Sequence, residues 1–314
     1  MAGMGPNLRI AAKLSALALA CSLSSVASLA AGSLSSSAAT STFRTNVAAA
    51  RPPAMTLSQS GWTIVSESHG VDLADRRSFR EPDGNVVTIY QFRAGRTEFA
   101  LHTGSEDPPG VAARVGPRAG PSISRAEAPH VIGAFNGGFK VASGSGGFEV
   151  TRRVFVKLLR GDASLVIDSN GAAHVGVWGQ DLPYLGERVT SVRQNLQPLI
   201  MSGRISPRIG DLAAWGVTLG GLPAVARSAV GQDRQGNLFC AGSMRALPSD
   251  LARALLAAGA VRAMELDINP YWVQIDSTPH PGGPLVAGVP NQERPGNQFV
   301  LGWTRDFVVV LARP

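Results

Sequence analysis

Residues 248–269 read PSDLARALLAAGAVRAMELDIN and carry the clearest secondary-structure pattern of the chain. Pro248 suits the first turn of a helix, where its missing N–H costs no hydrogen bond, and Asp250 places negative charge at the positive end of the helix dipole. Gly259 supplies a left-handed stop. The stretch between them predicts a helix, because apolar residues repeat at i, i+3, i+4 and i+7: Leu251, Ala254, Leu255 and Ala258.

The segment after this helix, residues 264–269, predicts a strand that Pro270 ends, because proline cannot donate to a sheet ladder. Side chains alternate across a strand. One face is therefore apolar, and the other carries three oxygen-bearing side chains: Glu265, Asp267 and Asn269. These three side chains are expected to line up where the strand leaves the core.

The rest of the chain favours short strands and turns around this unit. Hydrophobic residues make up 44% of the 314 residues and charged residues 16%, which is enough apolar material for a buried core. Glycine (36) and proline (21) are abundant and indicate many turns. Strands are predicted at 86–92, 97–102 and 131–135, and a hairpin at 165–177 with a tight Asn-Gly turn at residues 170 and 171.

The amino-terminus resembles a secretory signal peptide over residues 1–30. Arg9 and Lys13 provide the positive region, residues 14–29 form a broken apolar stretch, and Ser-Leu-Ala at 28–30 offers small residues for cleavage. The apolar stretch is too short and too rich in serine to predict a stable membrane span. The protein is therefore expected to be secreted or to reside in the cell envelope.

Residues 31–54 consist mostly of small and turn-forming residues and predict a flexible linker. The folded domain is then expected over 55–314. Cys21 follows Ala-Leu-Ala, a weaker resemblance to a lipoprotein cleavage site that ranks second to ordinary secretion. Cys240 lies in an apolar run without a second cysteine in the mature chain, so it predicts a buried core thiol.

Five short motifs give the chain a resemblance to a known family. They are AFNGGF at 134–139, SLVIDSNG at 164–171, QNLQPLIMSGR at 194–204, ARSAVG at 226–231 and the Leu-Asp pair at 266–267. Their order and spacing resemble the phosphodiester glycosidase family, which includes the N-acetylglucosamine-1-phosphodiester alpha-N-acetylglucosaminidase domain of the uncovering enzyme.

The resemblance implies an α+β fold with mixed β-sheets and few helices. It also implies a hydrolase that cleaves a glycosyl phosphodiester in a cell-envelope or extracellular glycan. Members typically continue Leu-Asp with two glycines and a serine, whereas this chain has Ile268, Asn269 and Pro270. The substitution leaves two further readings open: a different substrate, or a non-catalytic glycan- and phosphate-binding envelope protein that retains the fold.

Six residues are candidates for binding the substrate phosphate. Asn136, Gly137 and Gly138 could present backbone N–H groups to it, although an ordinary turn has the same sequence. Arg227, followed by Ser228, could hold the phosphate through its planar guanidinium. Because the neighbours of Arg227 are apolar, it requires a buried partner, which could equally be a carboxylate in a structural ion pair. Asn269 is included because it shares the oxygen-bearing face.

Asp267 and Glu265 are the candidate catalytic residues, because glycosidic cleavage commonly uses two carboxyl groups. Only Asp267 has a counterpart in the family motif. The same oxygen face could bind Ca²⁺, but three ligands fall short of the six to eight that calcium takes; no cofactor and no other metal are predicted. The net charge of +7 suits an anionic partner such as a phosphorylated glycan or a cell-wall polymer, and no basic tail or stripe indicates nucleic acid.

Overall fold

A computed structural model describes residues 58–59, 61–216 and 221–313, all of which belong to one compact unit, Pro53–Pro314. The predicted signal peptide at 1–30 and most of the proposed linker at 31–54 precede this unit, and all of both lies outside the described residues. Within the described ranges, no helix is long and apolar enough to cross a lipid bilayer.

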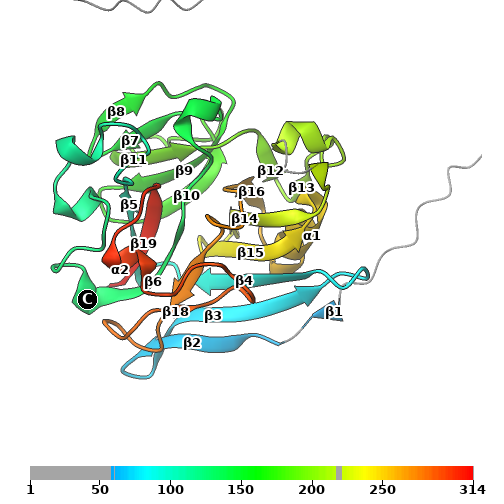
Figure 1. Ribbon diagram of the computed structural model, residues 1–314, viewed down its shortest axis with the longest axis horizontal. Helices are drawn as coiled ribbons and strands as arrows, with labels where there is room; N and C mark the ends of the chain where they lie inside the picture. The colour runs from blue at the N-terminus through cyan, green and yellow to red at the C-terminus, as the bar shows by residue number, and fades with distance from the viewer. Residues whose placement is uncertain (1–57, 60, 217–220, 314) are drawn as a thin grey trace, which may run out of the picture. The chain divides into compact units, whose positions relative to one another are not determined.

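The largest sheet has nine strands in the order β1-β3-β4-β15-β14-β16-β12-β13, with β2 paired to β3 (Figure 1). All of its ladders are antiparallel. We call it the large sheet. Its strands are β1 (Ser58–Gln59), β2 (Thr63–Ser68), β3 (Val71–Arg80), β4 (Val86–Phe92), β12 (Pro198–Met201), β13 (Arg204–Ile205), β14 (Val225–Gln232), β15 (Leu238–Ala246) and β16 (Arg262–Glu265).

Two five-stranded sheets complete the β structure, and their ladders are antiparallel as well. The second sheet has the order β10-β9-β11-β7-β8: β7 (Phe148–Val150), β8 (Arg153–Val156), β9 (Ala163–Asp168), β10 (Ala173–Val177) and β11 (Val189–Gln194). The third sheet has the order β18-β17-β6-β19-β5: β5 (Thr97–His102), β6 (Val131–Asn136), β17 (Ile275–Ser277), β18 (Val286–Ala287) and β19 (Phe307–Ala312).

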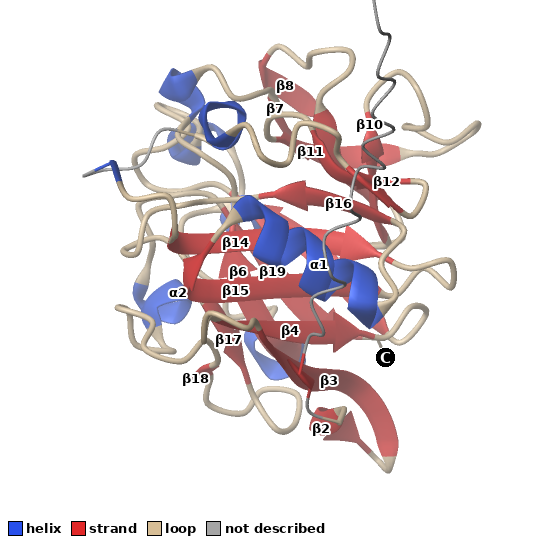
Figure 2. Cartoon of the chain, turned by 90° about the vertical axis from the view of Figure 1, so that its right-hand side faces the viewer, coloured by secondary structure: helices blue, strands red, loops and turns tan. Residues whose placement is uncertain are grey.

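Helices are few and short in the described part of the chain. They comprise α1 (Pro248–Ala258), α2 (Gln298–Leu301) and five 3₁₀ turns: Ala112–Arg114, Pro117–Ala119, Ala128–His130, Val141–Ser143 and Leu212–Trp215. Helix α1 lies across the large sheet over β4, β14 and β15 (Figure 2). It has the predicted bounds: the Asp250 carboxylate accepts the N–H of Leu247 at 2.8 Å, and Gly259 adopts φ 107°.

The predicted α+β class with mixed sheets is therefore wrong. The protein is predominantly β, because every ladder between its described strands is antiparallel and its two α-helices have 11 and 4 residues. The sequence pattern contains one strong helical repeat, and the short turn-rich connections suit hairpins, whereas parallel strands need long crossovers. The α+β expectation came from the family resemblance and not from this count of elements.

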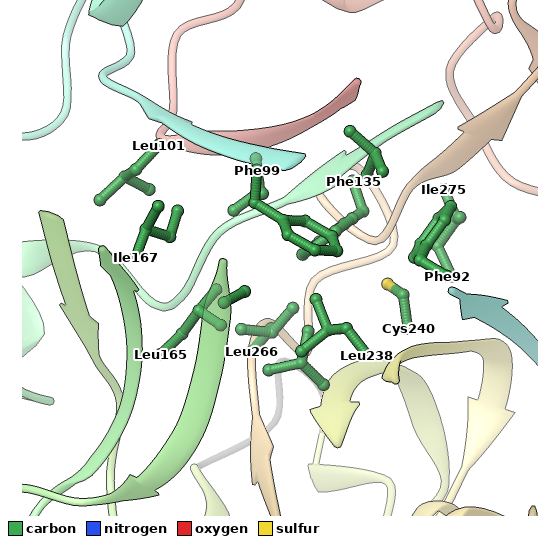
Figure 3. Close-up of a cluster of buried hydrophobic side chains, with 14 of the residues drawn as sticks. Phe92, Phe99, Leu101, Phe135, Leu165, Ile167, Leu238, Cys240, Leu266 and Ile275 are labelled. Carbon is green, nitrogen blue, oxygen red and sulfur yellow. The ribbon is translucent and has the colours of Figure 1, made fainter. Parts of the chain in front are cut away.

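The main core lies where the three sheets face one another. It contains side chains from the large sheet (Phe92, Cys240), the second sheet (Leu165) and the third sheet (Phe135), together with Leu266 (Figure 3). Cys240 is a free, fully buried thiol, as predicted, and burial raises its pKa. A separate cluster fills the space between α1 and the opposite face of the large sheet.

The predicted hairpin at 165–177 is confirmed as β9 and β10, although its turn differs from the expectation. Gly171 adopts a positive φ of 74°, whereas Asn170 is absent from the positive-φ residues. The N–H of Gly171 donates to the carbonyl of Asp168, and the N–H of Asp168 donates to Ala172. A three-residue loop of this kind needs only one left-handed position, and glycine occupies it.

The predicted strand 264–269 is shorter than expected at its exit. Strand β16 ends at Glu265, and residues 266–269 continue outside the sheet. Alternation holds through Leu266, because Met264 and Leu266 both enter the main core. Two backbone hydrogen bonds still join this stretch to β14, from the N–H of Leu266 to the Ser228 carbonyl and from the N–H of Ser228 to the Asp267 carbonyl. The pairing is irregular here, because Leu266 and Asp267 both bond to Ser228, and Asp267 and Glu265 therefore have different surroundings.

Candidate active site

Three of the five sequence motifs meet around one hydroxyl group, that of Ser228 on β14. Its Oγ accepts a hydrogen bond from Asn136 Nδ2 at 2.9 Å and from the backbone N–H of Asp267 at 3.1 Å. The N–H of Ser228 in turn donates to the carbonyl of Asp267 at 2.9 Å. The end of β6, strand β14 and the segment after β16 are thereby fixed to one another, and the backbone of Asp267 is held on both sides.

Asp267 is placed in the wall of a large pocket. Its Oδ1 accepts the backbone N–H groups of Ile268 (2.8 Å) and Asn269 (2.9 Å), and its Oδ2 lies 3.3 Å from Arg305 Nη2. Burial raises the pKa of Asp267 to about 6, against the lowering effect of Arg305 and of the two N–H donors. The carboxyl group can therefore change its protonation state near neutral pH.

The pocket has a volume of about 1100 Å³. Three cationic side chains line it, Lys140, Arg245 and Arg305, and among the described lining residues Asp267 is the one carboxylate. Tyr271 and Trp272 contribute aromatic surface to the same wall. Such a combination suits an anionic ligand with an extended non-polar or ring surface.

Arg305 is a site residue that sequence reasoning missed. Its Nη2 donates to the carbonyl of Gly138 at 2.9 Å, and its Nε lies 3.4 Å from the Asp107 carboxylate. The guanidinium carbon lies 5.3 Å from the ring centroid of Trp272. The sequence signal was the charged pair Arg-Asp at 305–306, directly before the apolar strand β19, a position where charge needs a partner.

The glycine turn predicted to bind phosphate is directed at Asp306. The N–H of Gly137 donates to the Asp306 carbonyl at 2.8 Å, and the N–H of Gly138 to Asp306 Oδ2 at 3.3 Å. A Cβ atom on residue 137 would lie 1.8 Å from Asp306 Oδ2, so only glycine fits there. The Asn136 amide is also occupied, because its Oδ1 accepts the N–H of Gln274. None of these three residues lines the pocket.

Asp306 and Arg193 form a second buried ion pair behind this turn. Arg193 Nε lies 2.7 Å from Asp306 Oδ2, and the exposed fractions of the two side chains are 1% and 0%. Arg193 also donates to the carbonyls of Phe139 and Gln194. The pair therefore fixes the chain on both sides of Phe139, a residue that lines the pocket.

Asn195, the next residue along the 194–204 motif, fixes the segment that carries Asp267. Its Nδ2 donates to the carbonyls of Glu265 and Leu266, each at 2.9 Å. Its Oδ1 accepts the N–H of Phe139 at 3.2 Å. The Asn195 amide thus adds two hydrogen bonds to the carbonyls on one side of this segment, whereas Ser228 of β14 bonds to the backbone of Leu266 and Asp267.

Glu265 and Arg227 face each other away from the pocket. Arg227 Nη1 lies 2.6 Å from Glu265 Oε1, and both side chains have no exposed surface. Arg227 also donates to the carbonyls of Trp215 and Ala246. Burial raises the pKa of Glu265 to about 7, opposed by Arg227. Of the two partners that the sequence left open for Arg227, a carboxylate and a substrate phosphate, this geometry provides the carboxylate.

The buried groups around Asp267 leave one negative charge in excess. Among the described residues, three separate ion-pair groups lie here: Arg193 with Asp306, Arg227 with Glu265, and Arg305 with both Asp107 and Asp267. Together they contain three guanidinium groups and four carboxyl groups, and the excess carboxyl group belongs to the group around Arg305. Unbalanced buried charge favours uptake of a proton. Asp267 is the carboxyl group of this set that reaches the pocket, so it is the one able to exchange that proton with a ligand or water.

Asn269 also lines the pocket, and its Oδ1 accepts the N–H of Tyr271 at 3.0 Å. Its amide therefore shapes the turn at 269–272 as well as facing the ligand space. Across the described residues, no group of three or more His, Cys, Asp or Glu side chains is arranged to hold a metal ion.

The fold and the site together define a predominantly antiparallel β protein with one ionisable carboxyl group in a cation-lined pocket. No protein-family model matches the chain, and no curated protein matches it.

Three solved structures are distantly similar. The first is the zebrafish N-acetylglucosamine-1-phosphodiester alpha-N-acetylglucosaminidase catalytic domain, auto-inhibited by its pro-peptide (13% identity, 83% of this chain and 89% of that chain, TM-score 0.48). The second is a hypothetical protein from Synechocystis (14% identity, 78% of this chain and 63% of that chain, TM-score 0.47). The third is a putative exported protein from Burkholderia pseudomallei (12% identity, 77% of this chain and 75% of that chain, TM-score 0.31). Likeness at this level identifies neither a substrate nor a catalytic residue in this chain.

Proposed function

We propose that this chain is a hydrolase that cleaves a glycosyl phosphodiester in a cell-envelope or extracellular glycan. The observation that carries the proposal is the position of Asp267, in the pocket wall with Oδ2 3.3 Å from Arg305 Nη2. Lys140 and Arg245 bring further positive charge to the same pocket. A phosphodiester is anionic at neutral pH, so these cations favour its binding.

Asp267 acts as the general base in this mechanism. Its Oδ2 takes a proton from a water molecule whose oxygen attacks the anomeric carbon of the sugar. The bond from that carbon to the phosphate oxygen breaks, and the electron pair leaves with the phosphate monoester. The free sugar and the monoester are released, and Asp267 returns its proton to solvent.

One carboxylate is sufficient for this leaving group. Ordinary glycosides need a second carboxyl group that protonates an alcohol as it leaves. A phosphate monoester is stable as an anion, with a pKa near 6 for its last proton, and Arg305 provides positive charge beside it. The proposal therefore assigns no proton transfer to Glu265, which lies outside the pocket.

Glu265 and Arg227 are positioning residues in this proposal. Their ion pair joins the end of β16 to β14. Ser228 bonds to Asn136, next to the glycine turn, and to the backbone N–H of Asp267, and so fixes the position of Asp267. In this proposal the phosphate is bound by Arg305, Lys140 and Arg245, and not by Arg227 or the glycine turn for which that role was predicted.

The test is a turnover assay of the purified chain on a panel of sugar-1-phosphodiesters, beside Asp267→Asn and Arg305→Leu. The matched control is Glu98→Gln, which changes a half-exposed carboxylate in a surface ion pair with Arg313. Turnover by the parent and the control, reduced at least about 10²-fold in both site variants, supports the hydrolase. Absence of turnover across the panel by folded protein contradicts it.

The second candidate is a non-catalytic glycan- and phosphate-binding envelope protein. The observation that favours it is that the second predicted carboxylate, Glu265, is sealed in an ion pair. Saturable binding of the same phosphodiesters without turnover, weakened by Arg305→Leu and unchanged by Asp267→Asn, would establish this alternative. The amino-terminal sequence supports an extracytoplasmic location for either function.

A further inference from the structure

Part of the pocket lining is apolar. It includes Phe139, Leu196, Val225, Met244 and Ile268, and each of these side chains remains partly exposed. They come from separate parts of the chain: Phe139 follows β6, Leu196 follows β11, Val225 and Met244 belong to β14 and β15, and Ile268 follows β16. Apolar side chains gathered in one concave surface indicate a ligand that covers them.

The floor of this apolar part is fixed by close packing. A Cβ atom on residue 216 would lie 2.8 Å from Ile268 Cδ1 and 2.9 Å from the Phe139 ring. Gly216 adopts φ 93°, which glycine accepts without strain. Ile268, one of the residues that replaces the glycine pair of the family motif, thus forms part of a preformed apolar surface beside Asp267.

The pocket lining combines charged and apolar side chains. Arg305 is paired with Asp267, whereas the side chains of Phe139, Leu196 and Ile268 contain no group that could bond a sugar hydroxyl. A sugar phosphate alone would leave these side chains in contact with water. At about 1100 Å³ the pocket is also at the upper end of the usual range for small-molecule sites, about 300–1,000 Å³.

We infer that the substrate carries an alkyl chain on its phosphate, so that the leaving group is a lipid monophosphate. The inference rests on the proposed function and names its substrate class. The phosphate lies beside Arg305 with its chain along Phe139, Met244 and Ile268, and the sugar is directed at Asp267. The bond that breaks remains the one between the anomeric carbon and the phosphate oxygen.

Binding is measured by titration calorimetry on the full chain, with methyl phosphate and n-decyl phosphate below its micelle concentration. Each methylene removed from water favours binding about fourfold, so even partial burial of the chain predicts a preference for decyl phosphate of at least about 100-fold. Ile268→Ser and, separately, Met244→Ser reduce decyl phosphate affinity at least about fivefold and leave methyl phosphate unchanged. The matched control is Val154→Ser, at an exposed valine on β8 outside the pocket.

Equal affinity for the two phosphates overturns the inference, and so does a decyl preference that both pocket variants retain, because the chain then binds elsewhere. Having two pocket variants guards against one that fails to fold. Turnover of sugar-1-phosphodiesters with methyl and decyl leaving groups separates this inference from the proposed function. Equal kcat/KM for both overturns the lipid leaving group alone; a pocket-dependent decyl preference in binding, without turnover of either, overturns the hydrolase alone.

Discussion

Glu265 and Asp267 are two residues apart, and each is paired with an arginine, yet the two pairs occupy different environments. The Glu265–Arg227 pair is fully sealed at 2.6 Å, whereas the Asp267–Arg305 pair is looser at 3.3 Å and borders the pocket. Glu265 is the last residue of β16, and Asp267 follows the end of the sheet. The same pair of groups, a carboxylate and a guanidinium, is therefore structural within the regular strand and is accessible to a ligand where the pairing with β14 becomes irregular.

The largest expected effect is the loss of turnover when Asp267, in the pair that borders the pocket, is substituted. Asp267→Asn removes the proton acceptor while keeping an oxygen for the N–H groups of Ile268 and Asn269. We expect kcat/KM on a sugar-1-phosphodiester to fall by about 10²–10⁴-fold, with a midpoint of thermal unfolding within a few degrees of the parent. Equal losses of stability and turnover would mean that Asp267 has only a structural role.

Substitution in the Glu265–Arg227 pair should instead reduce the stability of the protein. Glu265→Ala leaves the Arg227 guanidinium buried without its carboxylate, which costs about 3–5 kcal/mol of unfolding free energy. Urea unfolding followed by circular dichroism measures this loss. The double variant Glu265→Ala with Arg227→Met removes both charges and should recover much of the stability. A Glu265→Ala protein as stable as the parent would show that the sealed pair contributes nothing.

A smaller effect is expected in the pH dependence of kcat/KM, which tests whether Asp267 or another group such as Glu265 is the one that titrates. A general base must be ionised, and the pKa of Asp267 is about 6. We therefore expect kcat/KM to rise about tenfold per pH unit below pH 6 and to level off above it. The residual activity of Asp267→Asn should lack this limb. A limb that persists in the variant would assign the titration to another group.

A buried carboxyl group without any arginine sharpens the comparison further. Asp276 on β17 is fully buried, and its two oxygens accept Gln274 Nε2 at 2.5 Å and Gln292 Nε2 at 2.8 Å. Burial raises its pKa to about 8, with both glutamine amides opposing the shift. Two amides in place of a guanidinium leave the carboxyl group protonated at neutral pH.

A pH-dependent effect on stability follows from this raised pKa. The unfolded chain ionises Asp276 near pH 4 and the folded protein near pH 8, so folded protein holds the extra proton between these values and loses stability as pH rises through the window. Asp276→Asn cannot lose that proton and should gain about 1 kcal/mol per pH unit relative to the parent between pH 5 and pH 8. Urea midpoints at both pH values measure it, and a pH-independent difference would contradict the assignment.

Local patterns in the sequence predicted much of the secondary structure. The helix 248–258, its Gly259 stop and the hairpin at 165–177 follow from repeats and turn residues close together in the chain. The fold class was predicted wrongly, since pairing direction depends on strands far apart in sequence. Strand β14, for example, lies between β15 and β16, and no local pattern specifies that order.

The sequence by itself identified the segments that meet at the site, namely the Asn136 turn, Arg227-Ser228 and the Glu265–Asp267 stretch. Their residue types and order are local properties. Only the tertiary structure decided which side chains line the pocket. Asp267 and Asn269 line it, whereas Glu265 and Arg227 pair with each other. Arg305, which precedes β19, also lines the pocket and pairs with Asp267. The physical reason is that alternation assigns side chains to faces only while strand pairing is regular, and regular pairing ends after Glu265, where Leu266 and Asp267 both bond to Ser228.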